Sequence, residues 1–568
     1  MTSARNRDWV IKRSTIDNNL NMPEHLLQVA AARGVTDAKK YFKPSFTDLM
    51  PDPLSLVGMP NAVNTLLAKM DDDERIVVVG DYDVDGATSV AQMVRFFKAI
   101  GYEKFDYRIP LRMSEGYGLN PDIVQEIIDS GAGLIISVDS GTTALPAVKK
   151  ANEHNIPVII IDHHEAAGED DEHLPDAILV NPKQPKEDRS YEYLCTAGLI
   201  FIYIIALNRA LKDRNRPYVK DMNPFMALAA LGTVCDVVPL VDLNRAIVKH
   251  GLERLTHLEA IRSLSRHAMN DHVGYKFTAA DCGFVFGPCL NAAGRLDDMA
   301  LGVQLLTLED EGKINKIAKT LNQFNRNRKE MQKKAVKEAV DMVKKSDIKN
   351  TKVIISYNEE WHPGIVGLIA SKLKDFFDCP AIAIGTGGKG SCRSVEGFDI
   401  GQAIITAVSK GLLIKGGGHA MAAGLTLDPD KMGEFSSYMN QATKDLEPEP
   451  LYADLEIDVS KLTVPFIRSF DAMEPFGQHN PRPRVIIRNC YVSRVQVIKD
   501  LHIKAYVRNA YGGIEVVLWN GIDSKVGKML LNADDEMVDI YGTLEVNDWN
   551  GNSTPTISPE DITIKARQ

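Results

Sequence analysis

The sequence predicts a multi-domain α/β protein, with two α/β units joined by a long helix and followed by a small β-barrel. From Arg75 to about Pro239, apolar strand-like runs alternate with helical patterns, which indicates βαβ units and a parallel sheet. Residues 309–345 have helical periodicity, are rich in Lys and Arg, and contain no proline and no glycine after Gly312, so we expect one connecting helix. From about Pro465 the chain is rich in β-branched residues with spaced turn signals, which fits a small barrel.

The length of 568 residues allows roughly three to four domains at about 150 residues each. A hydrophobic fraction of 44% with 25% charged residues is ordinary for globular domains. The net charge of −10 argues against a generally basic nucleic-acid binder, although binding depends on local patches. The predicted divisions are a lead-in over 1–70, a catalytic α/β domain over 71–305, a connector helix over 306–347, a second α/β domain over 348–446 and a barrel over 450–568.

The sequence predicts a cytoplasmic protein that does not enter a membrane. Its seven cysteines show no CxxC pair or zinc-like spacing, as expected of reduced thiols. The N-terminus has no apolar signal core. The most apolar stretch, Leu199–Leu207, is much shorter than the roughly 20 residues of a membrane span, so we expect a buried helix there.

Four short acidic motifs accompany strand-like apolar runs of the first α/β domain. They are Asp81-x-Asp83-x-Asp85 after Ile76–Gly80, Asp139 after Gly133–Val138, Asp162-His163-His164 after Ile156–Ile161, and Asp236 within Gly232–Leu240. Because the carboxyl ends of parallel strands meet at one edge of a sheet, these side chains should converge. Crowded carboxylates in a low dielectric raise each other's pKa and destabilise the fold, so the sequence predicts bound cations there.

The residue types in these motifs suit a site for two divalent ions. Carboxylate oxygens with a few imidazoles fit Mn²⁺ or Mg²⁺, and the histidines favour Mn²⁺. Two such ions about 3.5–4 Å apart stabilise the attacking and leaving oxygens of a phosphoryl displacement. Gly86 permits a tight turn, and the N-terminus of the following helix favours a bound phosphate.

These motifs resemble those of the DHH phosphoesterase superfamily, and nearly the whole chain is similar to its family of bacterial single-strand-specific 5′→3′ exonucleases. The resemblance extends to the segments Asn291–Arg295, Trp361–Gly367, Gly416–His419 and Pro475–Gly477. Cys289 and Glu360 depart from the expected pattern, and neither is a proposed metal ligand. The resemblance implies an α/β fold: a parallel-sheet DHH domain, a long helix, a second α/β (DHH-associated) domain and a C-terminal OB-fold β-barrel.

The resemblance also implies roles for the acidic motifs. Asp139 would bridge two ions, which activate a water for attack. Asp162 would be either a ligand or the group that orients a histidine, and His164 would face the scissile phosphate as electrophilic stabiliser or general acid. The catalytic residues are then Asp139, Asp162, His163 and His164, and the metal ligands are Asp81, Asp83, Asp85, Asp139, His163 and Asp236.

A second group of residues offers contacts for phosphate. The glycine-rich stretch Gly416–Gly424 lies between helical patterns; its amides can approach a phosphate, or it forms a tight helix-packing turn. Gly390–Ser394 offers hydroxyl and guanidinium donors. The resemblance implies that the terminal phosphate or substrate backbone is held by Arg295, Ser391, Arg393, Gly418 and His419. Trp361 is expected in the domain core.

Aromatic residues of the tail are interleaved with basic ones, as in an OB-fold that stacks bases, although core packing would explain each of them equally well. They include Tyr506, Tyr511, Trp519, Tyr541 and Trp549.

The leading hypothesis is Mn²⁺-dependent hydrolysis of single-stranded DNA from the 5′ end to mononucleotides, in DNA repair or recombination. The alternative is a phosphodiesterase of short oligoribonucleotides or cyclic dinucleotides, although such enzymes lack the connector region and the tail. A pyrophosphatase has no use for a stacking barrel, and a non-catalytic replication scaffold would lack metal ligands. Single-stranded DNA is the expected partner, with a single-strand-binding protein or a helicase as further candidates. The sequence shows no self-association motif, so we expect a monomer. Mg²⁺ in place of Mn²⁺ stays open.

Overall fold

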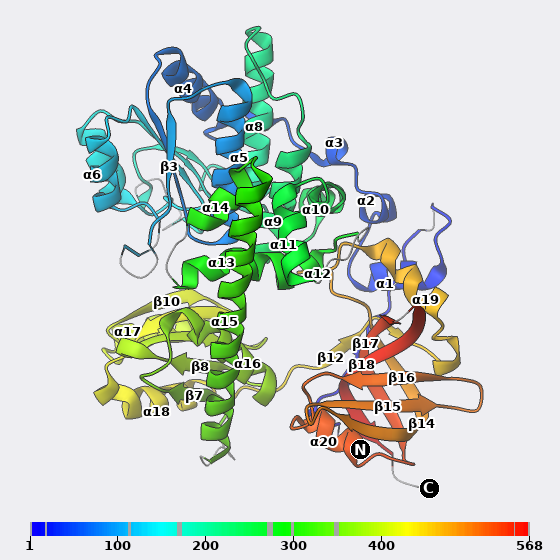
Figure 1. Cartoon of the computed structure of the whole chain (residues 1–568). Helices are drawn as coiled ribbons and strands as arrows, with labels where there is room; N and C mark the ends of the chain where they lie inside the picture. Colours follow the sequence, from blue (N-terminus) through cyan, green and yellow to red (C-terminus); the bar gives the residue numbers. More distant parts are fainter. Residues whose placement is uncertain are drawn as a thin grey trace. The chain divides into compact units, whose positions relative to one another are not determined.

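The structure is a computed structural model that describes residues 3–17, 20–111, 115–116, 118–166, 173–269, 276–296, 300–345, 351–549 and 551–565. The chain folds into two compact units (Figure 1). The parallel-sheet unit comprises Lys39–Arg326 and Glu474–Pro481, and the barrel unit comprises Met1–Ala38, Asn327–Met473 and Arg482–Gln568.

The parallel-sheet unit is built on five parallel strands in the order β3-β2-β4-β5-β6. Their bounds are β2 Ile76–Gly80, β3 Phe105–Arg108, β4 Leu134–Val138, β5 Val158–Ile161 and β6 Ile178–Val180. The chain passes from β2 to β3 on one side and then to β4 on the other. The order of strands therefore reverses between β2 and β4, and ligands of open α/β sheets bind at the carboxyl ends of such strands. The predicted parallel sheet is confirmed.

Helices cover both faces of this sheet. Alternate residues of a strand point to opposite faces: Ile76 and Val78 join the core formed with α4, α5, α8 and α9, whereas Val77 and Val79 join the core beneath α6 and α7. These helices are α4 Met59–Asp71, α5 Val84–Ile100, α6 Pro121–Asp129, α7 Leu145–Glu153, α8 Thr196–Asp213 and α9 Asn223–Cys235. The apolar stretch Leu199–Leu207 lies within α8, so the expected buried helix is confirmed.

The rest of this unit is helical. Its helices are α3 Phe46–Leu49, α10 Asp242–Leu255, α11 Glu259–Ala268, α12 Ala279–Asp281, α13 Gly287–Leu296 and α14 Ala300–Thr307, with the 3₁₀ turn η1 Pro53–Ser55 and the π-helix η3 Cys282–Phe286. Helix α15, Glu311–Lys345, belongs to both units, because the boundary falls at Arg326. The single long connecting helix predicted for residues 309–345 is confirmed.

The barrel unit contains a second α/β sheet with strand order β10-β11-β9-β8-β7. β7 and β8 are parallel, and the remaining neighbours are antiparallel. The elements are β7 Ile354–Tyr357, α16 Pro363–Phe377, β8 Ala381–Ile384, η4 Thr386–Gly388, β9 Lys389–Arg393, α17 Ile400–Ser409, β10 Lys415–His419, β11 Ala422–Thr426, η5 Pro429–Lys431 and α18 Met432–Ala442. Trp361 is 2% exposed and lies in the core beside α16, as predicted.

The glycine-rich stretch forms a strand rather than a turn between helices. Lys415–His419 is the edge strand β10, paired antiparallel with β11. Glycine has a low strand propensity, so no strand signal was present in the sequence, and pairing with β11 decides the conformation. A Cβ on Gly418 would lie 2.4 Å from the Ala422 carbonyl oxygen, so the two strands approach too closely for a side chain at this position.

The C-terminal strands close into the predicted barrel. The order β13-β14-β15-β16-β18-β17 is completed by pairing of β14 with β17, which leaves five strands in a ring, as in an OB-fold. The elements are β12 Leu451–Ala453, β13 Leu455–Glu456, η6 Val459–Lys461, α19 Val464–Ser469, η7 Phe470–Met473, β14 Arg484–Ile498, β15 His502–Arg508, β16 Gly513–Leu518, α20 Lys525–Leu531, β17 Met537–Trp549 and β18 Asn552–Ile564.

The barrel aromatics divide between core and surface. Tyr541 is 1% exposed and packs in the core, whereas Tyr511 and Trp519 are 86% and 60% exposed. The side chain of Trp549 lies outside the described residues. Only the exposed aromatics are available for stacking on bases.

The N-terminal lead-in supplies a strand that the sequence did not predict. β1, Trp9–Ile11, pairs in parallel with β12, and helices α1 Glu24–Ala32 and α2 Ala38–Phe42 follow. A three-residue strand carries too short a pattern to detect, and its partner lies more than 400 residues away in sequence.

Candidate metal centre

The first acidic motif lies on the turn between β2 and α5. Asp83 is the N-cap of α5, and its side chain accepts a hydrogen bond of 3.1 Å from the Gly86 amide. Asp81 and Asp85 are buried. A Cβ on Gly86 would lie 2.4 Å from the Asp81 carbonyl oxygen, so this turn requires glycine. The turn therefore brings three carboxylates to the carboxyl edge of the sheet.

The N-terminus of α8 holds Asp85 and links it to Asp139. The Thr196 and Ala197 amides each donate to the Asp85 carboxylate at 2.8 Å, and helix N-termini favour negative charge. The Thr196 hydroxyl donates to Oδ1 of Asp139 at 3.1 Å. Asp139 follows β4 and has a φ of 60°. This left-handed conformation is uncommon for a non-glycine residue, and residues that adopt it cluster at functional sites. Thr196 thus connects carboxylates from two motifs.

Asp162, which follows β5, is surrounded by hydrogen-bond donors. Its Oδ2 accepts from the Thr142 amide at 3.1 Å and hydroxyl at 2.7 Å. Its Oδ1 accepts from the amides of His163 and His164 at 2.8 and 3.2 Å, and pairs with Nδ1 of His164 at 2.7 Å. These bonds fix the carboxylate, and through it the ring of His164.

Asp236 does not follow a strand, so that expectation is wrong. It is the C-cap of helix α9, and its amide donates to the Gly232 carbonyl at 2.9 Å. The run Gly232–Leu240 spans the end of α9 and the turn after it, and a short apolar run does not distinguish a strand from a helix. Asp236 nevertheless joins the cluster, with Oδ2 lying 3.5 Å from Nε2 of His163.

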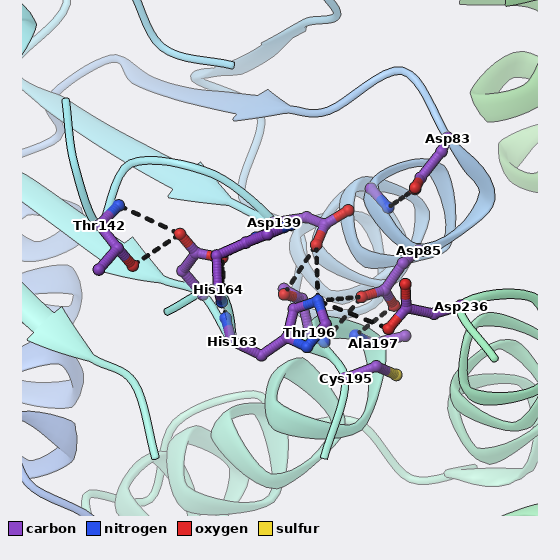
Figure 2. A network of polar contacts seen from close by, with 12 residues as sticks. Asp83, Asp85, Asp139, Thr142, His163, His164, Cys195, Thr196, Ala197 and Asp236 are labelled. Atoms are coloured by element: carbon purple, nitrogen blue, oxygen red, sulfur yellow. Dashed lines mark hydrogen bonds and ion pairs between the residues drawn. The ribbon is translucent and has the colours of Figure 1, made fainter. Parts of the chain in front are cut away.

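His163 lies at the centre of the acidic residues (Figure 2). Its Nε2 lies 3.5 Å from Oδ1 of Asp139 and 3.9 Å from Oδ2 of Asp85. Three groups offer ligand atoms that lie within 4.8 Å of one another: Asp81–Asp83–Asp139, Asp85–His163–Asp236 and Asp139–His163–His164. Asp139 and His163 each belong to two groups. The groups therefore overlap, as neighbouring ion sites with shared ligands would.

Buried polar atoms in this cluster fit bound cations. Both ring nitrogens of His163 and Oδ2 of Asp236 are buried without a hydrogen-bond partner in the part of the chain that the structure describes. Such atoms are rare in folded proteins unless something satisfies them. The three groups contain only carboxylates and imidazoles, the ligand types that suit Mn²⁺ and Mg²⁺. The donor set thus matches the predicted ions.

The electrostatics of the cluster lead to the same conclusion. Burial raises the pKa of Asp85 to about 6, and the charge of Asp83 adds to this rise. Burial, and then the neighbouring carboxylates, raise the pKa of Asp139 and Asp236 well above the usual range. Burial lowers the pKa of His163 to about 3, so its ring is neutral at pH 7 and can act as a ligand. The charged carboxylates of this cluster therefore destabilise the folded chain until a cation compensates them.

Asp162 and His164 form an ion pair beside the cluster. Burial raises the pKa of Asp162, but the hydrogen bonds from His164 and Thr142 outweigh it and hold that pKa well below the usual range. Burial by itself would lower the pKa of His164, but the hydrogen bond to Asp162 and the negative charge of Asp162 raise it above its ordinary value. The His164 side chain is 42% exposed, so the raised pKa favours a proton on a ring that a substrate can reach.

Four residues of this site were not predicted from the sequence. Besides Thr142 and Thr196, they are Asn181 and Lys183. Asn181 donates to the Thr142 hydroxyl and to the His164 carbonyl, both at 2.9 Å, and the charge of Lys183 acts on two of the candidate ligands. Asn181 and Lys183 follow β6, so the rule that polar residues follow strands could have found them. The threonines carry no such signal.

The predicted phosphate-binding residues lie on other elements. Ser391 and Arg393 lie on β9, and Gly418 and His419 on β10, all in the barrel unit. Arg295 lies in α13 of the parallel-sheet unit, and its side chain is outside the described residues. The structure thus brings four of the five together on one sheet, in a different unit from the metal ligands.

The strands β9, β11 and β10 arrange these side chains on one face. Nη1 of Arg393 donates to Oγ of Ser391 at 2.9 Å. Arg393 is paired with Ala422, which is paired in turn with His419, and directly opposed residues share a face. Only the small Ala422 stands between Arg393 and His419 across the three strands, so no large side chain separates these two potential anion contacts.

Three family models match this chain: the DHH family N-terminal domain at residues 75–233, the DHHA1 domain at 350–445 and the RecJ OB domain at 453–561. The single-stranded-DNA-specific exonuclease RecJ of Bacillus subtilis (strain 168) is 33% identical, over 99% of this chain and 71% of that protein. The enzyme of the same name from Escherichia coli (strain K12) is 32% identical, over 97% of this chain and 98% of that protein. The chain belongs to the RecJ family.

Solved RecJ structures share this fold. The crystal structure of Thermus thermophilus RecJ in complex with Mn²⁺ has a TM-score of 0.81 and 24% identity, over 99% of this chain and 80% of that one. A crystal structure of exonuclease RecJ bound to manganese has a TM-score of 0.59 and 29% identity, over 70% of this chain and 97% of that one. The fold class predicted from the sequence is therefore confirmed as that of RecJ, whereas the exact domain boundaries stay a prediction.

Among the described residues of this RecJ relative, no helix has the length and apolar character needed to cross a membrane. All seven of its cysteines are free thiols.

Substituting Asp236→Asn should stabilise the metal-free protein and weaken metal binding. Burial and neighbouring carboxylates raise the pKa of Asp236, so the fold tolerates its neutral carboxyl better than its charged form. The stability that the protonated carboxyl contributes is therefore present at low pH and is lost as pH rises through the folded-state pKa. Removing the charge should therefore raise the free energy of unfolding of EDTA-treated protein at about pH 8, by on the order of 1 kcal/mol, and by much less at about pH 5. Urea unfolding at both pH values measures this difference.

Saturating Mn²⁺ is the control for this substitution, since the parent should then become the more stable protein. A variant that is less stable than the parent in both the presence and the absence of Mn²⁺ would contradict the charge-repulsion account.

Proposed function

We propose that this protein is a metal-dependent exonuclease that hydrolyses single-stranded DNA from the 5′ end to mononucleotides. The observation that carries this proposal is the set of three overlapping ligand groups in a chain that belongs to the RecJ family over nearly its whole length. The alternative, a phosphodiesterase of short oligoribonucleotides or cyclic dinucleotides, is not supported by the comparisons, because the RecJ OB domain model matches the tail.

Two divalent ions would be held by the six predicted ligands. We assign Asp81, Asp83 and Asp139 to one ion and Asp85, His163 and Asp236 to the other, with Asp139 within reach of both. Bound ions supply an activated water nucleophile at neutral pH and stabilise charge on the reacting phosphate. RecJ structures have been solved with Mn²⁺ and with Mg²⁺, and the imidazole in the ligand set favours Mn²⁺.

His164 would act on the phosphate, and Asp162 would position it. The five hydrogen bonds that Asp162 accepts suit an orienting group better than a metal ligand. Its pairing with Nδ1 leaves Nε2 of the same ring to face the scissile phosphate. Because Asp162 raises the pKa of His164, the protonated ring is favoured, and in that form Nε2 can donate a proton to a phosphoryl oxygen or to the leaving oxygen.

The surface formed by β9 and β10 would hold the 5′-terminal phosphate. Arg393 and Ser391 supply guanidinium and hydroxyl donors that are already hydrogen-bonded to each other, and a preformed pair of donors suits a phosphate. His419 adds a third polar side chain on the same face. Arg295 is assigned to the same phosphate by resemblance alone.

The barrel would bind the strand that leads to the cleaved end. Its exposed aromatics, Tyr511 and Trp519, offer faces for base stacking, which is worth about 1–3 kcal/mol per base. We further propose that the enzyme acts in DNA repair and recombination in the cytoplasm, where free thiols such as its seven cysteines stay reduced. Partnership with a single-strand-binding protein or a helicase, and the monomeric state, stay predictions.

Substituting Asp139→Asn should lower exonuclease activity by more than about 100-fold. Losing even a residue that hydrogen-bonds to a metal ligand lowers metal affinity or activity about 10- to 100-fold. Asparagine keeps the size of aspartate and tolerates the φ of 60° at this position. Release of mononucleotide from oligonucleotides labelled at the 5′ or the 3′ end measures activity and polarity together. The exposed Asp129→Asn is the matched control, and should keep parental activity. Early release of the 3′ label by the parent would overturn the proposed polarity.

Substituting Arg393→Ala should weaken engagement of a 5′-phosphorylated end. Loss of a charged hydrogen bond costs about 1.5–3 kcal/mol, equivalent to a roughly 10- to 150-fold lower kcat/KM. The effect should be much smaller on an end with a 5′-hydroxyl, and Mn²⁺ affinity should not change. Lys389→Ala, which removes an exposed cation from the same strand, is the matched control. Equal kcat/KM for Arg393→Ala and the parent on phosphorylated ends would refute this assignment.

A further inference from the structure

Asp236 differs from Asp85 and Asp162 in how its carboxylate is held. Asp85 and Asp162 accept hydrogen bonds from backbone amides, whereas Oδ2 of Asp236 is buried and has no hydrogen-bond partner among the described residues. The position of this carboxylate therefore depends on the backbone on either side of it. On the N-terminal side, α9 fixes it through the bond from the Asp236 amide to the Gly232 carbonyl.

The backbone on the C-terminal side of Asp236 is strained. Val237 has a φ of 60° and is 64% exposed. A left-handed conformation is a genuine outlier for a β-branched residue, and such strain persists only where the surroundings impose it. Some other part of the chain must therefore hold the Val237–Leu240 turn.

The segment Glu474–Pro481 holds this turn from the far end of the sequence. The Leu240 amide donates to the Gln478 carbonyl at 2.9 Å. Leu240 is 2% exposed, and a Cβ on Gly477 would lie 2.7 Å from its Cδ1, so the backbone of the segment packs directly against the leucine side chain. Although its neighbours in sequence belong to the barrel unit, the segment itself belongs to the parallel-sheet unit.

Buried polar contacts hold the segment in place. Arg245 of α10 is 2% exposed, and its guanidinium donates to the Glu474 and Pro475 carbonyls at 3.0 and 3.3 Å. The same guanidinium donates to the Tyr41 carbonyl at 2.7 Å and lies over the Tyr41 ring. The Tyr41 hydroxyl donates to Oδ1 of Asn480 at 2.7 Å. Arg245 and Tyr41 therefore clamp the segment at both ends.

Asn480 also fixes the shape of the segment itself. Its Nδ2 donates to the Pro475 carbonyl at 2.8 Å, and its backbone forms a reciprocal pair of hydrogen bonds with Gly477, of 2.9 and 3.0 Å. These bonds close the segment into a compact loop and present the Gln478 carbonyl to Leu240.

We propose that the Glu474–Pro481 loop is a positioning element of the metal centre: it holds the Val237–Leu240 turn and thereby sets the placement of the Asp236 carboxylate. Tyr41, Arg245 and Asn480 are then positioning residues, which act through the loop rather than on the substrate. The proposal rests on the proposed function only in assigning Asp236 as a ligand.

The test compares Asn480→Ala and Tyr41→Phe with the parent, as full-length chains stripped of metal. Tyr41→Phe removes a single hydroxyl and is the milder change. Asn208→Ala is the matched control, because Asn208 fixes a different loop of the same unit through two bonds with Val219, of 2.9 and 2.8 Å. Calorimetric titration with Mn²⁺ gives the affinity, thermal unfolding gives the stability, and steady-state kinetics on single-stranded DNA give kcat and KM.

Asn480→Ala should weaken Mn²⁺ affinity about tenfold, the lower range for residues that orient metal ligands, and Tyr41→Phe should weaken it less. At subsaturating Mn²⁺, kcat should fall with little change in KM for DNA, and excess Mn²⁺ should restore it. Asn208→Ala should lower thermal stability without changing Mn²⁺ affinity. Parental Mn²⁺ affinity in both loop variants would overturn the proposal, whatever their stability.

The Mn²⁺ titration separates this inference from the proposed function. If the parent does not degrade DNA but the loop variants bind Mn²⁺ more weakly, the proposed function fails and the inference stands. If the parent is an exonuclease and the variants bind Mn²⁺ normally, the inference fails alone.

Discussion

The repulsion among buried carboxylates at one edge of the parallel sheet is the constraint on which the rest of this structure depends. Burial and mutual repulsion raise the pKa of Asp85, Asp139 and Asp236. The charged carboxylates therefore destabilise the folded state unless cations are bound. The sheet order, the helix N-terminus at Thr196 and the left-handed Asp139 all bring these groups together. Such an arrangement lowers the stability of the metal-free fold, and its presence is explained by the ions that it can bind.

The supports of the ligands differ in kind. Asp85 is fixed by the amides of α8, and Asp162 by Thr142 and by its own neighbours, so both are held by contacts in the first sheet and its helices. Asp236 relies on backbone placement, and its turn contacts a loop from the distant part of the sequence. A site assembled in this way couples the metal centre to a segment that connects directly, along the chain, to the barrel.

The sequence was informative where local pattern decides structure. The apolar runs of β2, β4 and β5 and the long helix α15 were predicted, because burial and periodicity leave a clear record in sequence. The run that contains Asp236 is not the strand that its apolar residues predict, because a short apolar segment has no distinguishing period, and β10 carries no strand signal because it is rich in glycine. Thr196 and Asn480 could not be predicted, since their roles arise from contacts between segments far apart in sequence. The ligand set itself came from resemblance, and the structure adds that its members lie together.

The number of ions bound per chain tests the central claim most directly. Metal-stripped protein, titrated with Mn²⁺ at about pH 7.5 and followed by calorimetry with elemental analysis of the complex, should bind two ions per chain, with release of protons from the carboxylates. Because Asp139 and His163 are each shared between ligand groups, an Asp139→Asn chain should bind fewer than two. Binding of one ion or none by the parent, or two ions in both proteins, would contradict the account of two adjacent ions held by shared ligands.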